Sequence, residues 1–148
     1  MDVRPARPDE IERLARLYYR CRNEMAYLPP MPESDTGLVA DRMREHDEIW
    51  VAEDEGRLVG FLAVEHSRTL ETEMLERLYV DPEEQGRGIG TVLLDEAKQL
   101  RPDGLHLWVF QKNEGARRFY ERNGFHLVKL TDGAANMERE PDALYRWP

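Results

Sequence analysis

The segment from Leu78 to Thr91 constrains the fold most, because it changes from strand to loop to helix within a short distance. Its first three residues are apolar or aromatic and predict the end of a strand, which Pro82 terminates because it has no amide donor. Three glycines follow, at positions 86, 88 and 90, and they free the backbone of Cβ atoms. Apolar residues at helical spacing then predict a helix from Thr91 to Leu100. The glycine loop therefore opens onto a helix N-terminus, whose unpaired amides favour an anion.

Spacing separates three interpretations of this loop. A P-loop needs Lys-Ser or Lys-Thr directly after its last glycine, and this chain has neither. A dinucleotide fingerprint needs G-x-G-x-x-G close behind a strand, whereas this chain has G-x-G-x-G five residues after its strand. The pattern present is Q-x-x-G-x-G, from Gln85 to Gly90. It resembles the pyrophosphate loop, [QR]-x-x-G-x-[GA], of the GNAT superfamily of acyl-CoA-dependent N-acetyltransferases.

A second segment, residues 113–125, resembles the other signature of that family, N-x-x-A-x-x-F-Y-x-x-x-G-F. Asn113 suits a helix N-cap, and Gly124 suits the left-handed residue that ends a helix, with Phe125 folding back on it. Either segment alone would suit an ordinary turn or a structural helix. Together, separated by a predicted strand at 105–110, they favour membership of the family.

Length and charge narrow the class of protein. The length of 148 residues predicts one domain, 1–148, which is large enough to bury a hydrophobic core without disulfide bonds or a structural metal. There are 21 Lys and Arg against 30 Asp and Glu, so the net charge of −9 argues against nucleic acid and favours cationic or amine partners. The one cysteine, Cys21, excludes an internal disulfide framework and falls at a core position of a helix. No apolar run suits a signal peptide or a membrane span, so we expect a cytoplasmic protein without a membrane partner.

The element order predicted along the chain is β-α-α-β-β-β-α-β-α-β-β, an α/β (α+β) fold. The predicted strands are 2–7, 49–52, 58–64, 74–80, 105–110, 125–130 and 143–147, and the predicted helices are 8–25, 38–46, 91–100 and 113–123. Trp108 and Trp147 are expected in the core. The resemblance implies one mixed, twisted sheet of about seven strands with about four helices. It also implies that the sheet splays between its fourth and fifth strands to admit the pantetheine arm.

The same resemblance implies which residues bind coenzyme A. The pantetheine amides are expected to pair with the backbone of the strand that ends at Leu78, Tyr79 and Val80. Asn113 is expected to contact the same arm. The residues expected at the pyrophosphate are Gln85, Gly86, Arg87, Gly88, Ile89, Gly90 and Thr91. Gln85 and Arg87 are long enough either to brace the loop or to touch phosphate.

The expected reaction is transfer of an acetyl group from acetyl-CoA to a primary amine, with Tyr120 matching the general acid of the family. The alternative for Tyr120 is an ordinary aromatic on a buried helix face. Glu73 and Glu76 are candidates for the general base, although the glutamate that many members carry falls here at Met74. The alternative for both is a solvated strand face, and water with backbone could suffice for an amine of low pKa.

The loop 27–35 is dense in proline, and its apolar residues are expected to be exposed. In the family this place belongs to the acceptor site, so Tyr27, Leu28 and Met31 are candidate acceptor residues; a flexible cap is the alternative. The histidines at 46, 66, 106 and 126 lack metal-ligand spacing, and no metal is expected. A non-catalytic acyl-CoA-binding module is the alternative function, and a nucleotide-binding domain is disfavoured by the loop spacing. The acceptor, a small molecule or a peptide, is not readable, and the oligomeric state is open, although dimers are usual in the family.

Overall fold

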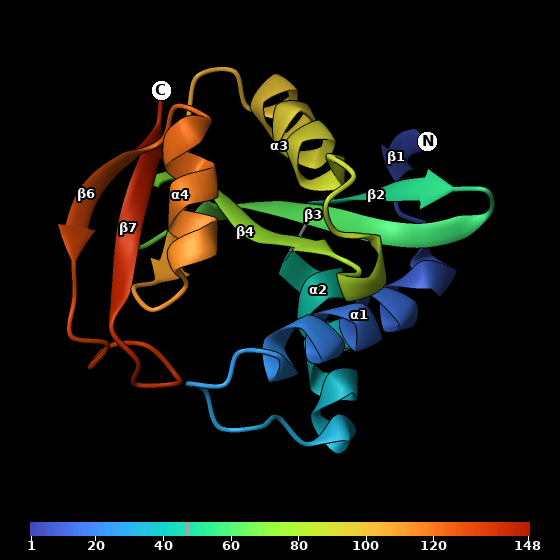
Figure 1. Ribbon diagram of the computed structural model, residues 1–148, viewed down its shortest axis with the longest axis horizontal. Helices are drawn as coiled ribbons and strands as arrows, with labels where there is room; N and C mark the ends of the chain where they lie inside the picture. Colours follow the sequence, from blue (N-terminus) through green and yellow to red (C-terminus); the bar gives the residue numbers. More distant parts are fainter. Residues whose placement is uncertain (47) are drawn as a thin grey trace.

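Seven strands form one mixed sheet in the computed structural model, which describes residues 1–46 and 48–148 (Figure 1). The strands are β1 Asp2–Pro5, β2 Glu48–Asp54, β3 Arg57–Ser67, β4 Thr72–Val80, β5 Leu105–Phe110, β6 His126–Leu130 and β7 Asp142–Trp147. The helices are α1 Ile11–Asn23, α2 Thr36–His46, α3 Ile89–Leu100 and α4 Glu114–Arg122, with short 3-10 turns η1 Pro8–Glu10, η2 Glu33–Asp35 and η3 Pro82–Glu84. The predicted element order and the mixed seven-stranded sheet are confirmed.

The strand order β1-β2-β3-β4-β5-β7-β6 divides the sheet into two antiparallel halves. The halves meet where β4 runs parallel to β5, and this junction has a single paired register, Met74 with His106. Beyond that pair the two strands separate toward their carboxyl ends. The predicted splay between the fourth and fifth strands is therefore present.

Each face of the sheet packs against its own helices (Figure 1). β3 is apolar at successive positions because both of its faces are buried. Leu62 and Val64 pack in the cluster that contains Leu93 and Leu94 of α3, whereas Phe61 and Ala63 pack in the cluster under α1 and α2. The helices α3 and α4 thus cover one face, and α1 and α2 cover the other.

A β-bulge lies in β4 at Glu76. Val64 of β3 pairs with Leu75 and Ala63 pairs with Arg77, so Glu76 is an extra residue on the β4 side. The spacing of apolar residues along β4 is consistent with this bulge. Leu75 and Leu78 pack in the same core cluster although they are three residues apart, which breaks the alternation of a regular strand.

Two expectations about burial are wrong. Trp108 is expected in the core, but 41% of its surface is exposed, because alternation along β5 buries its neighbours Leu107 and Val109 instead. The loop 27–35 is expected to expose its apolar residues, but Leu28 is buried. Trp147, in contrast, packs against the core cluster on the α3 and α4 side, as expected.

Candidate active site

The glycine loop has an open main-chain conformation. Gly86 and Gly88 have φ angles of +84° and +80°, and a Cβ atom at either position would meet no heavy atom within 4 Å. Gly88 is the N-cap of α3, which begins at Ile89, two residues earlier than predicted. The amides of residues 89–91 are therefore the first three of the helix, which have no intrahelical acceptor. These features suit a site where an anion meets main-chain donors.

Ion pairs hold this loop from its outer side. Arg87 pairs with Glu84 and, at 2.7 Å, with Asp54 of β2, and Arg57 pairs with Glu84 at 2.6 Å. Hydrogen bonds from Arg87 and then Arg57 lower the pKa of the Glu84 carboxyl, so this group stays charged near neutral pH. Arg87 is thus a brace of the loop in this structure. The Gln85 amide lies 3.5 Å from the carbonyl oxygen of Val80.

The second sequence signature forms α4 as predicted. The Asn113 side chain accepts a hydrogen bond from the Ala116 amide at 3.2 Å, so it is the N-cap. At the other end Gly124 has a φ of +90°, and the Phe125 amide donates to the carbonyl of Tyr120 at 3.0 Å. A Cβ atom on Gly90 would lie 3.5 Å from the Phe119 ring, so the start of α3 lies against α4.

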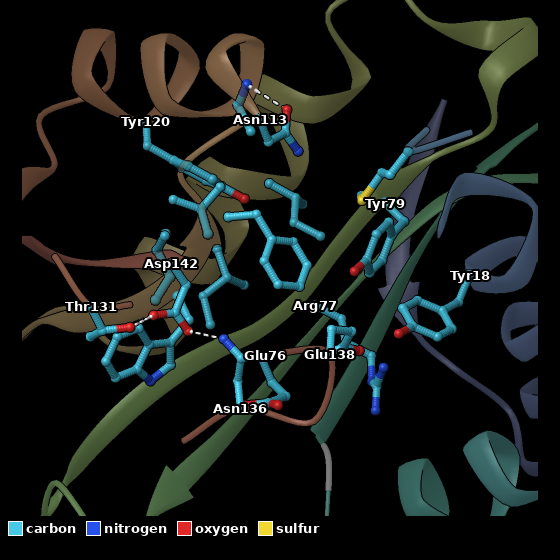
Figure 2. A pocket seen from close by; sticks show the side chains of 18 of the residues that line it. Tyr18, Glu76, Arg77, Tyr79, Asn113, Tyr120, Thr131, Asn136, Glu138 and Asp142 are labelled. Atoms are coloured by element: carbon cyan, nitrogen blue, oxygen red, sulfur yellow. Dashed lines mark hydrogen bonds between the residues drawn. The ribbon is translucent and has the colours of Figure 1, made fainter. Parts of the chain in front are cut away.

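A cleft of about 460 Å³ occupies the splay between β4 and β5 (Figure 2). Its walls come from both halves of the sheet and from the helices on both faces. The lining residues are Tyr18, Met25, Leu75, Glu76, Arg77, Leu78, Tyr79, Leu107, Trp108, Val109, Phe110, Asn113, Ala116, Tyr120, Thr131, Ala135, Asn136, Glu138 and Asp142. The cleft therefore connects the α4 side of the sheet with the α1 side.

Tyr120 reaches from α4 into this cleft (Figure 2). Its ring packs edge-to-face against Phe119 and Phe125, with centroid distances of 5.3 and 5.5 Å. Burial raises the pKa of the Tyr120 phenol above its ordinary value, because the charged phenolate would lose its hydration. Within residues 1–46 and 48–148, no group forms a hydrogen bond with its hydroxyl. A protonated donor therefore points into the cleft, and the described residues offer it no acceptor.

The two candidate bases occupy different surroundings. Glu76, at the bulge, lines the cleft. Glu73 is outside the cleft lining, where its carboxylate accepts from Arg101 at 2.7 Å and lies 2.6 Å from the His66 ring. Arg101 and then His66 lower the pKa of Glu73. The structure thus brings Glu76, but not Glu73, together with Tyr120.

Other predicted residues divide in the same way. Leu78, Tyr79 and Asn113 line the cleft. Val80, the glycine loop, Tyr27, Leu28 and Met31 are outside its lining. The glycine loop instead follows β4 directly, at the carboxyl end of the strand that lines the cleft.

The loop 27–35 has a supporting role in this structure. The Met31 backbone exchanges two hydrogen bonds with the Asn23 side chain, and Arg22 donates to the carbonyl of Pro29 at 2.7 Å. Tyr27 packs edge-to-face on Phe110 of β5 at 5.9 Å. The loop therefore supports the cleft from behind instead of lining it.

Several lining residues were missed from the sequence. Tyr18 lies in α1 and Met25 follows it. Thr131, Asn136 and Glu138 come from the connection between β6 and β7, and Asp142 is the first residue of β7. The connection carries no motif, although its Thr, Asp, Gly and Asn residues are typical of a turn with side-chain hydrogen bonds. That composition was the available signal.

Membrane-spanning and metal-binding features are both absent from the part of the chain that the structure describes. Within the ranges 1–46 and 48–148, no helix has the length and apolar character needed to cross a membrane. In those same ranges, no three His, Cys, Asp or Glu side chains are grouped so that they could hold a metal ion.

Comparisons with known proteins agree with this geometry. The family model described as "Acetyltransferase (GNAT) domain" matches residues 45–127, more than half of the chain. Peptidyl-lysine N-acetyltransferase YiaC of Escherichia coli is 36% identical over 112 residues, covering 75% of this chain and 70% of that protein. Peptidyl-lysine N-acetyltransferase YjaB of Salmonella typhimurium is 32% identical over 135 residues, covering 86% of this chain and 85% of that protein.

Among solved structures, PaiA N-acetyltransferase of Thermoplasma acidophilum, crystallised in complex with coenzyme A, has a TM-score of 0.72. It is 20% identical, and the alignment covers 99% of this chain and 97% of that one. This neighbour supports the fold.

Proposed function

Because the chain belongs to the GNAT acetyltransferase family and is an N-acetyltransferase, we propose that it transfers the acetyl group of acetyl-CoA to the primary amine of a lysine side chain. The observation that carries this proposal is the cleft between β4 and β5, with the Tyr120 phenol inside it and the glycine loop at the end of β4. The choice of lysine is supported by the two relatives, which are named peptidyl-lysine N-acetyltransferases.

The glycine loop fits the pyrophosphate of acetyl-CoA. Gly86 and Gly88 have open space on the side where a Cβ atom would stand, with no heavy atom within 4 Å of that position, so a phosphate can approach the main chain there. The amides at the start of α3 would donate to it, and the helix dipole favours its charge by about 0.3–1 kcal/mol. Leu78 and Tyr79 would offer backbone to the pantetheine arm along the cleft wall.

Acetyl-CoA supplies an activated thioester, and its cleavage leaves a thiolate that needs a proton. Tyr120 donates that proton from its phenol oxygen. Its raised pKa keeps the phenol protonated at neutral pH, and its hydroxyl is free of internal acceptors in the described structure. Solvent returns a proton to Tyr120 after each turnover.

A lysine amine with an ordinary pKa of about 10.4 is protonated at pH 7, roughly 3.4 pH units below that pKa. Glu76 accepts the proton that the amine must lose, directly or through one water. This role is supported by the lining of the cleft, which includes both Glu76, at the bulge, and Tyr120 from α4. Glu73 remains committed to Arg101 and His66, so we assign it no role in the reaction.

The test combines binding with turnover. The thermal midpoint is measured with and without acetyl-CoA, and free thiol release is followed with a lysine peptide and with a panel of small primary amines. Ligand at 100 times its Kd stabilises the fold by about 2.7 kcal/mol, which is readily observed. A shift with peptide-dependent thiol release is the expected result. A shift without release from any amine would favour a non-catalytic acyl-CoA-binding module, and the absence of a shift would contradict the assignment of the glycine loop.

A further inference from the structure

The connection between β6 and β7, together with the first residue of β7, forms a side-chain-bonded unit that we call the 131–142 segment. Asp142 is only 8% exposed, and hydrogen bonds from two other residues of the segment converge on its carboxylate. Its carboxylate accepts a hydrogen bond from the Thr131 hydroxyl and one from the Asn136 amide, the latter at 3.0 Å (Figure 2). One buried carboxylate therefore fixes two points of a segment that has no regular secondary structure.

Further hydrogen bonds close the segment on itself. The Asn136 amide donates to the carbonyl of Glu140 at 2.7 Å, and the Glu140 amide donates back to the Asn136 side chain at 3.2 Å. Gln111 donates to the carbonyls of Thr131 and Asp142 at 2.8 and 3.0 Å. The segment is thus held to β5 and β7 as a preformed wall.

This wall turns its polar side chains toward the cleft. Asn136 and Glu138 line the cleft, as does Glu76 from β4. Glu138 is held from behind by Arg22 of α1 at 3.8 Å, and Arg22 is itself fixed to the carbonyl of Pro29. Two carboxylates from different parts of the chain therefore line the cleft, and that of Glu138 lies at its α1 end, beside Arg22.

The charges that face this end favour a cation. The lining contains the carboxylates of Glu76, Glu138 and Asp142 and one guanidinium, that of Arg77. The Arg77 guanidinium lies over the Tyr18 ring at 5.0 Å from its centroid. Three cations lie around the cleft but outside its lining: Arg22 approaches Glu138 from α1, Lys112 pairs with Glu140, and Lys129 lies over the Trp108 ring.

We propose that Glu138, placed by the Asp142-centred segment, is a specificity-determining residue that selects acceptors carrying positive charge beside the reactive lysine. Asp142 is a positioning residue in this arrangement. The inference rests on the proposed function, because it assigns the α1 end of the cleft to the acceptor. It adds the class of acceptor, a basic lysine-containing segment of a peptide.

The test uses two peptides that differ only in the residues flanking a central lysine, two arginines in one and two glutamates in the other. The ratio of kcat/KM for the two peptides measures the charge preference. Glu138→Gln is expected to reduce this ratio by about fivefold, with the KM for acetyl-CoA unchanged. Glu24→Gln is the matched control, since it removes one carboxylate at the end of α1 from outside the cleft lining, and it should leave the ratio unchanged.

Equal ratios in the wild type and in Glu138→Gln would overturn the proposal, and so would an equal fall in Glu24→Gln. The affinities of the two fluorescently labelled peptides, measured by anisotropy in the presence of coenzyme A, separate this inference from the proposed function. If no thiol is released, the proposed function fails, and the ratio of the two binding affinities still decides the role of Glu138.

The role of Asp142 needs a readout beyond stability. Asp142→Asn is expected to raise the KM for both peptides while leaving the KM for acetyl-CoA unchanged. The charge preference of Glu138→Gln/Asp142→Asn should equal that of Asp142→Asn alone, because Glu138 acts from a position that Asp142 sets. Additive effects would overturn the positioning role. If Asp142→Asn does not fold, Thr131→Val removes one of the two hydrogen bonds and gives the same comparison.

Discussion

The glycine loop, which follows the cleft-lining strand β4, and the 131–142 segment, which lines the cleft itself, are built by opposite means. The loop obtains its shape from the main chain, with left-handed Gly86 and Gly88, the start of α3 and an exposed brace at Arg87. The 131–142 segment obtains its shape from side chains that converge on the buried Asp142. A main-chain site is encoded by adjacent residues, whereas a side-chain site depends on partners that only the fold brings together.

The largest expected effect tests a residue that belongs to neither region. Tyr120→Phe should lower kcat by roughly 100-fold or more, because it removes the proton donor to the thiolate. The KM values for both substrates should change little, and the thermal shift with acetyl-CoA should remain. Tyr19→Phe, which removes a phenol from α1 outside the cleft lining, is the control. A Tyr120→Phe variant with wild-type kcat would show that solvent protonates the thiolate.

The pH profile gives a second measurement on Tyr120. Burial raises its pKa above the ordinary value of about 10, so the acid form persists as the pH rises. The kcat of the wild type should therefore show no loss from Tyr120 between pH 7 and about 10. An alkaline limb near pH 8 that Tyr120→Phe abolishes would contradict this assignment.

The next prediction tests the 131–142 segment, the region whose shape depends on side chains. Gly133 has a φ of +82°, and a Cβ atom there would lie 2.4 Å from the backbone of Glu140. Gly133→Ala should reduce the free energy of unfolding by about 2–4 kcal/mol, from the strained φ and the clash together. Gly56→Ala, at a φ of +77° with open space around it, should cost only about 1 kcal/mol. Equal costs, measured by denaturant unfolding, would mean that the segment rearranges freely.

A smaller effect tests the main-chain-built region. Gly88→Ala places a methyl group where the pyrophosphate is expected, in space that is open in the structure. The KM for acetyl-CoA should rise by about tenfold, the loss expected for one or two charged hydrogen bonds, and the KM for the peptide should stay the same. A rise confined to the peptide KM would contradict this assignment, because it would mean that the glycine loop contacts the peptide and not acetyl-CoA.

The smallest expected effect concerns the brace. Arg87→Ala leaves Asp54 and Glu84 without that guanidinium, and the KM for acetyl-CoA should rise by about two- to threefold. The lowered pKa of Glu84 means that the brace is complete above the ordinary carboxyl pKa and weakens only as the pH falls below it. The KM for acetyl-CoA of Arg87→Ala, divided by that of the wild type, should therefore be constant from pH 6 to 8. A ratio that changes across this range would assign the effect to another group.

The comparison also explains what could be read from the sequence. The order of helices and strands along the chain, α4 with its cap at Asn113, and the glycine loop before α3 depend on local patterns, and these structural predictions are confirmed. Tyr120 could be singled out because its spacing from Asn113 matches the family signature, and its place on the cleft comes from the structure. Local backbone preferences suffice for elements of this kind.

The rest depended on contacts between distant residues. Glu73 and Glu76 looked equivalent in the sequence, and only the pairing of β3 with β4 reveals the bulge that separates them. The loop 27–35 is expected at the acceptor because it falls where family members build that site, yet hydrogen bonds from Arg22 and Asn23 hold it so that Tyr27, Leu28 and Met31 are outside the cleft lining. The 131–142 segment could not be predicted, because its hydrogen bonds join irregularly spaced side chains such as Asn136 and Asp142, and Gln111 from outside the segment, in no recognisable motif.

The single register between Met74 and His106 also bears on the mechanics of the sheet. Because one residue pair joins the two antiparallel halves, the angle between them depends on what fills the cleft between β4 and β5. A pantetheine arm along β4 would add hydrogen bonds where β5 does not pair with this strand. We therefore expect the amides at the end of β4 to exchange slowly with solvent only in the complex with the cosubstrate. Cosubstrate supply would then control the stiffness of the sheet as well as the supply of acetyl groups.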